Sequence, residues 1–202
     1  MNRSVVILVD AREKRPLPIP EYLPVWDRVS PPHQPRAHTV RITTRTTTLV
    51  TGDYALEGYL DACLVERKAH LTELAENLTT PDHARFIRSL ERLRDSCRRP
   101  VLLLEGDPLT LAAPIKAHGR RPPHPPFLVR DLLLSTLLEY NVELMLLPTS
   151  SASSRRAAGE WVAAKLIAGA CHGHDQRPAS SLPPGPHDPE RRVGVVPGGP
   201  VA

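Results

Sequence analysis

Hydrophobic positions along the chain form short continuous runs separated by helical stripes. A continuous apolar run of strand length predicts a strand covered on both faces. Three such runs lie at 5–9, 100–105 and 142–147. The Thr- and Val-rich segment 38–49 predicts a further strand, and 62–68 predicts the returning strand of a hairpin that turns at 56–60. The chain therefore contains the strands of a substantial sheet.

Helices are predicted where apolar residues recur at i, i+3, i+4 and i+7. These stripes lie at 71–78, 82–99, 127–140 and 152–170. The proline-rich stretch 16–35 predicts a loop, with a single turn around 22–26. Strands and helices that alternate in this order predict an α/β layer fold, a mixed sheet flanked by helices in a single domain.

The last thirty residues differ in composition from the rest. Pro and Gly fill twelve of these positions, so we divide the chain into a folded domain, 1–170, and a disordered tail, 171–202. No apolar run approaches the roughly 18–20 residues that span a bilayer. The first residues enter a strand directly, without a secretory apolar region, and three widely spaced Cys form no disulfide framework. We expect a cytoplasmic protein without membrane partners.

The charge is moderately basic. The formal net charge is +4, the sequence pI is about 9.2, and 22 Arg outnumber 4 Lys. The planar Arg guanidinium donates two parallel hydrogen bonds to phosphate, which favours a nucleic-acid partner slightly. A general compositional bias is the alternative, because Ala and Pro are also abundant.

Acidic residues stand beside or inside the predicted strands. Asp10 ends the first strand, Asp53 follows a glycine in a turn, and Glu66 lies two residues before Lys68. Side chains at i and i+2 of a strand share a face, so Glu66 and Lys68 project together while Arg67 projects to the other face. Carboxylates that bind Mg²⁺ or Mn²⁺ beside a Lys are typical of metal-dependent phosphodiesterases. An ordinary surface ion pair is the alternative, because an acid two residues before a Lys arises often by chance.

Three segments together are more specific than that pair. Val-Asp-Ala-Arg-Glu at 9–13, Thr-Gly-Asp-Tyr at 51–54 and Leu-Val-Glu-Arg-Lys at 64–68 occur in this order. The combination resembles the nuclease domain of the xeroderma pigmentosum group F endonuclease family, also called the excision-repair cross-complementing group 4 domain. The similarity runs from about Val5 to about Ala168 and includes the helical segments 71–78 and 85–93.

This resemblance implies a restriction-nuclease-like core that cuts DNA, including branched DNA in repair or recombination, with Mg²⁺ or Mn²⁺. It implies that Asp53 and Glu66 are metal ligands and that Lys68 is the catalytic lysine. Asp10 is expected as a further catalytic acid at the metal, with a weaker expectation for Glu13. Relatives pair through this domain, so a homodimer is also expected.

DNA contacts are expected from arginines. Arg12 and Arg67 belong to the family-like segments, although strand alternation turns Arg67 away from the metal and leaves an ion pair equally open. Three further arginines form one stripe on a predicted helix, namely Arg85, Arg88 and Arg92. This stripe predicts either a track for the DNA backbone or a solvated helix face, and the sequence does not separate the two.

The chain departs from the family pattern at Thr72, where the motif has its final Asp, with Glu73 beside it. We expect Thr72 to be the N-cap of the following helix. The departure leaves open a DNA-binding domain of the same fold with weak or no catalysis. A third alternative is an α/β protein that handles phosphate without DNA, although the sequence contains no phosphate-binding loop motif.

Overall fold

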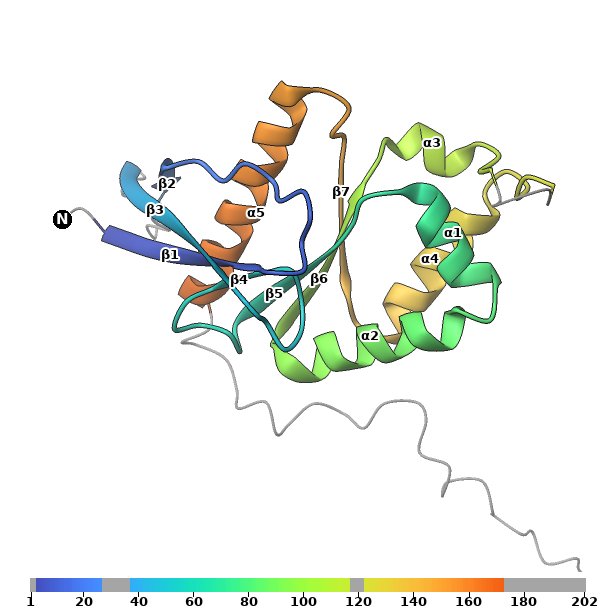
Figure 1. Ribbon diagram of the computed structural model, residues 1–202, viewed down its shortest axis with the longest axis horizontal. Helices are drawn as coiled ribbons and strands as arrows, with labels where there is room; N and C mark the ends of the chain where they lie inside the picture. Colours follow the sequence, from blue (N-terminus) through green and yellow to red (C-terminus); the bar gives the residue numbers. More distant parts are fainter. Residues whose placement is uncertain (1–2, 27–36, 117–121, 173–202) are drawn as a thin grey trace, which may run out of the picture.

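The computed structural model describes residues 3–26, 37–116 and 122–172. A seven-stranded mixed sheet runs through this part of the chain in the order β2-β3-β1-β4-β5-β6-β7 (Figure 1). The strands are β1 (Arg3–Asp10), β2 (Tyr22–Trp26), β3 (Ala37–Thr47), β4 (Tyr54–Leu56), β5 (Cys63–Lys68), β6 (Arg99–Glu105) and β7 (Glu143–Leu147). The helices are α1 (Leu71–Thr79), α2 (His83–Ser96), α3 (Pro108–Ala112), α4 (Leu128–Glu139) and α5 (Ala152–His172).

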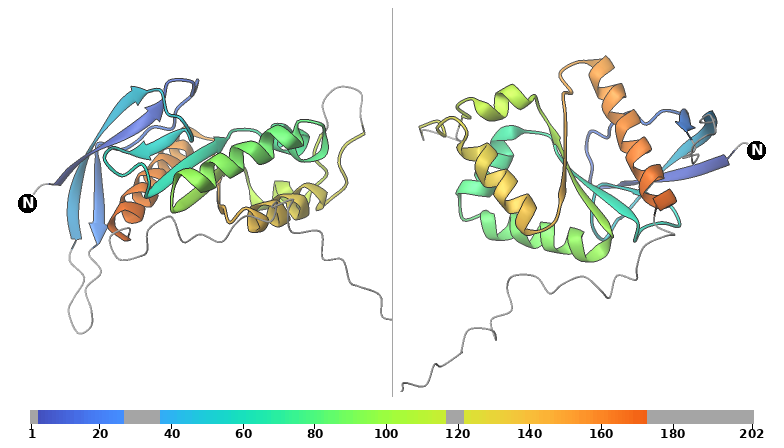
Figure 2. Two further views of the ribbon diagram at one scale, coloured as in Figure 1. Left: turned by 90° about the horizontal axis from the view of Figure 1, so that it is seen from below. Right: turned by 180° about the vertical axis from the view of Figure 1, so that it is seen from behind.

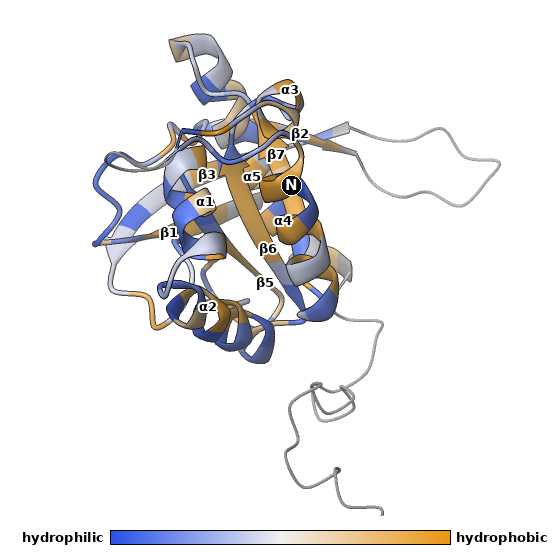
Figure 3. Ribbon diagram, turned by 90° about the vertical axis from the view of Figure 1, so that its right-hand side faces the viewer, coloured by the Kyte–Doolittle hydropathy of each residue, from blue (hydrophilic) through white to orange (hydrophobic). Residues whose placement is uncertain are grey.

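Two apolar cores lie on the two faces of the sheet. On one face α1, α2 and α4 pack over alternate residues of the central strands, such as Leu64 and Leu102. On the other face α5 covers the intervening residues, such as Val65 and Leu103 (Figure 2). The continuous apolar runs therefore alternate between two covered faces. Figure 3 shows the hydrophobic β5 and β6 beside helices that carry many hydrophilic positions.

Close packing fixes α5 against the sheet. A Cβ built at Gly159 comes within 2.0 Å of the Pro18 carbonyl oxygen, and one at Gly169 comes within 2.6 Å of the Cys63 Cβ. Both helix positions therefore require glycine. The first contact holds the loop that follows β1 against α5, directly behind the strands that carry the acidic residues.

Most predicted elements are confirmed, and segment 22–26 is corrected. It is the strand β2 rather than a single turn, because it pairs antiparallel with β3 at the edge of the sheet. Pro24 is accommodated there because an edge strand leaves one side of its backbone unpaired. The strand β7 is also an edge strand and is half-buried rather than fully buried.

Two predicted helices end at other residues than expected, and one short helix was not predicted. The helix predicted over 82–99 ends at Ser96, because the chain enters β6 at Arg99. The short α3 was not predicted, although Pro108 starts it and the Asp107 carboxylate accepts a 2.8 Å hydrogen bond from the Leu109 N–H. The helix α5 continues to His172, two residues past the helix end predicted at Ala170, and the rest of the predicted tail, 173–202, lies outside the described residues. Among the helices described, none is long and apolar enough to cross a membrane.

Candidate active site

The turn before β4 fixes the position of Asp53. Gly52 has a φ of +78°, a left-handed conformation that favours glycine, and a Cβ there would lie 3.3 Å from the Val65 carbonyl oxygen. The Asp53 N–H donates to that same Val65 oxygen at 2.8 Å, and the Asp53 carbonyl accepts from the Asp10 N–H at 2.9 Å. The backbone of Asp53 is therefore held between β1 and β5.

Glu66 and Lys68 lie on one face of β5, as their spacing predicts. The Lys68 Nζ lies 3.5 Å from Oε1 of Glu66 and 3.6 Å from Oε1 of Glu73 on α1. These side chains open into a cavity of about 330 Å³ between the sheet and α2. The charged and amide residues that line it are Arg12, Asp53, Glu66, Lys68, Glu73, Asn77, Arg85 and Arg92.

Asp53 and Glu66, two of the three carboxylates that line the cavity, repel each other. Burial, and after it the negative charge of Glu66, raise the pKa of Asp53 to about 7, while the Arg67 N–H, 2.7 Å from Oδ2, acts in the opposite direction. A divalent cation relieves such repulsion, and Mg²⁺ is typically held by one or two protein carboxylates together with water and substrate phosphate. Asp53 and Glu66 thus fit a magnesium or manganese ion. Within the described residues, no group of three or more His, Cys, Asp or Glu is arranged to hold a metal.

The side chain of Asp10 does not reach the cavity. It is fully buried. Its Oδ1 accepts from the backbone N–H and the Nε of Arg12 at 2.8 and 3.0 Å, and its Oδ2 accepts from Nη2 of the same arginine. The hydrogen bonds from Arg12 hold the pKa of Asp10 below its usual range. The structure therefore brings Arg12, rather than the Asp10 carboxylate, into the cavity.

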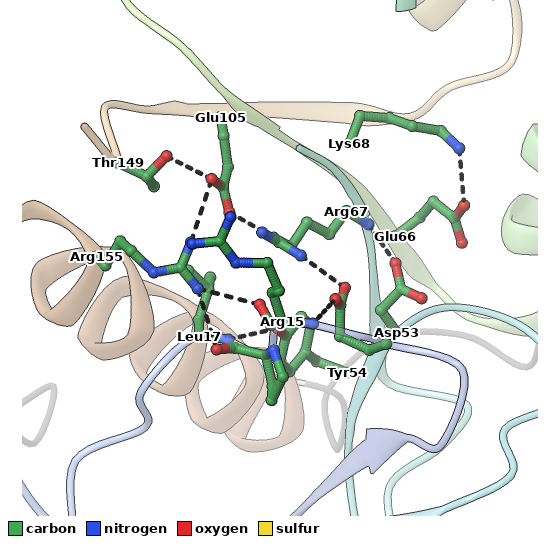
Figure 4. Close-up of polar contacts among 12 residues, drawn as sticks. Arg15, Leu17, Asp53, Tyr54, Glu66, Arg67, Lys68, Glu105, Thr149 and Arg155 are labelled. Carbon is green, nitrogen blue, oxygen red and sulfur yellow. Dashed lines mark hydrogen bonds and ion pairs between the residues drawn. The ribbon is translucent and has the colours of Figure 1, made fainter. Parts of the chain in front are cut away.

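Arg67 also points away from the cavity, to the opposite face of the sheet, as strand alternation predicts. Its side chain is only 4% exposed and forms ion pairs with Glu13 at 2.8 Å and Glu105 at 2.5 Å (Figure 4). Of the two interpretations left open by the sequence, the structure favours the ion pair over a phosphate contact. Glu13 is directed toward this pair and does not line the cavity.

The arginine stripe of α2 divides into two parts. Arg85 and Arg92 line the cavity across from the acidic residues, whereas Arg88 is exposed but does not line it. Ser89 and Asn77 also line the cavity, and the sequence analysis missed both. Helical spacing could have found Ser89, which is four residues from Arg85 and therefore on the same face of the helix.

Thr72 does not cap α1. The helix begins at Leu71 with His70 as its N-cap, so Thr72 is the second helical residue, and the predicted N-cap is wrong. Glu73, the neighbouring residue, lies in the first turn, where the helix dipole favours a negative charge. It carries the carboxylate that reaches Lys68.

The residues of this cavity lie within a match to a known family model, the ERCC4 domain, over residues 9–162. The match covers more than half of the 202 residues. The chain belongs to the ERCC4 domain family. This match confirms the resemblance to the nuclease domain of the XPF type.

Two solved structures are similar to this ERCC4 domain. They are XPF from Aeropyrum pernix in complex with DNA, with a TM-score of 0.48, and XPF from the same organism, with a TM-score of 0.47. Each is 20% identical over 81% of this chain. The ERCC4 domain described here spans 65% of the length of either solved chain. No curated protein matches the sequence.

Proposed function

We propose that this ERCC4 domain is an endonuclease that hydrolyses phosphodiester bonds of DNA with Mg²⁺ or Mn²⁺. The observation that carries the proposal is the meeting of Asp53, Glu66 and Lys68 in one cavity. Two arginines of α2, Arg85 and Arg92, stand across that cavity. Acidic metal ligands, an ammonium group and arginines that can bind phosphate together fit metal-assisted hydrolysis of a phosphodiester.

Four charged residues of the cavity have proposed roles, and Asp10 supports one of them. Asp53 and Glu66 hold the divalent ion, which supplies neutralisation of the phosphate charge and activation of a water. Lys68, beside Glu66 and Glu73, stabilises the negative charge that develops on the phosphate oxygens. Arg12 donates to a phosphate of the substrate. Asp10 keeps the Arg12 guanidinium in place, and we leave it out of the ligand set because Arg12 occupies both of its oxygens.

The proposed substrate is branched or otherwise structured DNA. Support comes from membership of the ERCC4 family and from the basic wall of α2, along which a DNA backbone can lie. The experiment is cleavage of labelled linear, flapped and forked DNA in Mg²⁺, in Mn²⁺ and in excess chelator. We expect cleavage that the chelator abolishes and that is fastest on a branched substrate.

The same panel separates the alternatives. Binding without cutting in either metal selects a silent DNA-binding domain. Neither binding nor cutting selects a protein that acts on a different phosphate compound. Equal cleavage of linear and branched DNA contradicts the proposed substrate but leaves the proposed reaction intact.

We propose in addition that two copies of the chain pair through this domain. The support is the family resemblance, together with exposed leucines on α4, where Leu138 is 82% and Leu134 is 42% exposed. Sedimentation velocity over a range of concentrations tests it. We expect a dimer that Leu138→Ser weakens, and a monomer at all concentrations contradicts the proposal.

A further inference from the structure

A buried cluster of opposite charges lies on the α5 side of the sheet, beneath the proposed metal site. Its members come from five separate segments of the chain and are Glu13, Arg67, Glu105, Thr149 and Arg155. Figure 4 labels the last four of them. None of them lines the cavity that holds Asp53 and Glu66. The cluster is therefore not part of the site already described.

Glu105 is the centre of the cluster. Its Oε1 accepts a 2.5 Å hydrogen bond from the Arg67 Nε, and its Oε2 accepts from the Thr149 hydroxyl. The Arg155 guanidinium lies 3.6 Å from the same Oε2. The side chain of Glu105 is 6% exposed and that of Arg67 is 4% exposed, so water does little to solvate either charge.

Two contacts join this cluster to the proposed site. The backbone N–H of Arg67 donates to the Asp53 Oδ2 at 2.7 Å, so the residue whose side chain the cluster holds also supplies a donor to a proposed metal ligand. The other Arg67 branch holds Glu13 at 2.8 Å, and Glu13 is the neighbour of Arg12. Arg67 therefore connects both Asp53 and the loop that carries Arg12 to the buried cluster around Glu105.

Arg155 of α5 connects the buried cluster to the loop that follows β1. The Arg155 Nη2 donates to the backbone oxygens of Arg15 and Pro16 at 3.0 and 3.1 Å. A buried ion pair seldom adds stability over apolar side chains of the same shape, because removing its charges from water is costly. Two glutamates and two arginines in such a place are better explained by the geometry they impose on Asp53 and Arg12.

We propose that Glu105 is a positioning residue of the proposed nuclease site, and that Thr149 and Arg155 hold it in place. Glu105 acts through Arg67, which orients the Asp53 carboxylate and the Arg12 loop. The inference rests on the proposed function, because it concerns the metal and phosphate contacts of that same site. The inference gives the junction between β7 and α5 a role in the proposed site, although this junction is distant in sequence from every motif residue.

The test is Mn²⁺ binding to Glu105→Gln by isothermal titration calorimetry, without DNA. The substitution keeps the size of the side chain but removes one of the two carboxylate charges that hold Arg67. Loss of a group that orients a metal ligand typically weakens binding 10–100-fold. We expect a Mn²⁺ dissociation constant at least 10-fold larger than that of the wild type. With DNA we expect kcat to fall by a similar factor at subsaturating metal, while KM for DNA stays within about twofold.

Two matched variants control for general effects. Glu143→Gln makes the same chemical change in the exposed ion pair with Lys165, at the edge of the sheet. Leu166→Ala removes apolar volume from the buried face of α5 and lowers stability without touching the cluster. At a temperature where all variants are folded by circular dichroism, both should bind Mn²⁺ like the wild type. Weakening by Leu166→Ala equal to that by Glu105→Gln would mean that the cluster is structural only, which overturns the inference.

A milder pair of variants serves if Glu105→Gln does not fold. Thr149→Val removes the hydroxyl bond to Glu105, and Thr149→Ser keeps it. We expect weaker Mn²⁺ binding in the first and wild-type binding in the second. If the wild-type protein binds Mn²⁺ and cuts DNA, and both Thr149 variants bind Mn²⁺ as the wild type does, the inference is overturned while the proposed function stands. A wild-type protein that neither binds Mn²⁺ nor cuts DNA overturns the proposed function, and this inference with it.

Discussion

The ammonium group of Lys68 lies between two carboxylates, 3.5 Å from Oε1 of Glu66 and 3.6 Å from Oε1 of Glu73. Glu66 precedes it on the same strand, whereas Glu73 reaches it from the first turn of α1. The family motif has an acid at position 72, where this chain has Thr72. The contact from Glu73 supplies a negative charge to Lys68 from the next position along the helix.

The first prediction concerns the pair on β5. Glu66→Gln and Lys68→Ala should each abolish detectable DNA cleavage, because a metal ligand and a charge-stabilising group are each worth several kcal/mol of transition-state stabilisation. Both side chains are partly exposed at the cavity, so circular dichroism spectra should remain those of the wild type. Wild-type rates in either variant contradict the assignment of the site.

A second prediction concerns the departure from the motif. Glu73→Gln should lower the cleavage rate, because it removes one of the two carboxylates beside Lys68. Thr72→Asp should raise the rate at saturating Mg²⁺ and make the Glu73→Gln change matter less. It should alter the free energy of unfolding by no more than about 1 kcal/mol, since an acid in the first turn is favoured by the helix dipole.

The comparison uses single-turnover rates of the wild type, both single variants and the double variant. Equal rates in all four proteins would show that neither position takes part in the chemistry.

The third prediction divides the arginines of α2. Arg85→Gln and Arg92→Gln should each weaken DNA binding and reduce the salt dependence of binding by roughly one counterion, because both side chains line the cavity. Arg88→Gln is the matched control on the same helix and should leave the salt slope unchanged. Fluorescence anisotropy in Ca²⁺ or chelator, from low to moderate salt, measures the slopes. Identical slopes for the three variants contradict a DNA track on this helix.

The fourth prediction concerns pH and Asp53. The pKa of Asp53 is raised from the ordinary 3.8 of a free aspartate to about 7 in the folded domain. Between these values the folded state binds more protons than the unfolded state, so the unfolding free energy of the metal-free protein falls as pH rises. The substitution Asp53→Asn removes the free-energy cost of ionising Asp53 in the folded domain. The variant should therefore be more stable than the wild type above pH 7, by up to about 4 kcal/mol, and nearly equal to it below pH 4.

Denaturant melts of the two proteins at several pH values, in chelator, test this prediction. Added Mg²⁺ should raise the melting temperature of the wild type more at pH 8 than at pH 5, and that of Asp53→Asn little at either pH. Parallel stability curves across the pH range would contradict the raised pKa.

The sequence by itself determined the order of the elements and the central pair of the site. Continuous apolar runs predicted β1, β6 and β7, and two-residue alternation placed Glu66 and Lys68 on one face of β5. Both are local properties of the backbone, which the side-chain pattern reports directly. Asp53 was also a candidate from its place after a glycine in a turn, and the resemblance gave it the expected role of a metal ligand. The turn at Gly52 places it in the same cavity.

Only the tertiary structure decided the partners of the remaining charged residues. Strand β2 exists because β3 offers it an edge, which no local pattern within 22–26 reveals. Asp10 pairs with Arg12, only two residues away, but the Leu49 carbonyl that accepts from the same guanidinium at 2.7 Å comes from a distant segment. Arg67 pairs with Glu13 and Glu105, and these ion pairs form only when the strands and loops are in register. A carboxylate carries the same charge in a metal site as in an ion pair. Its surroundings in the folded chain decide between the two, and these come from segments far apart in the sequence.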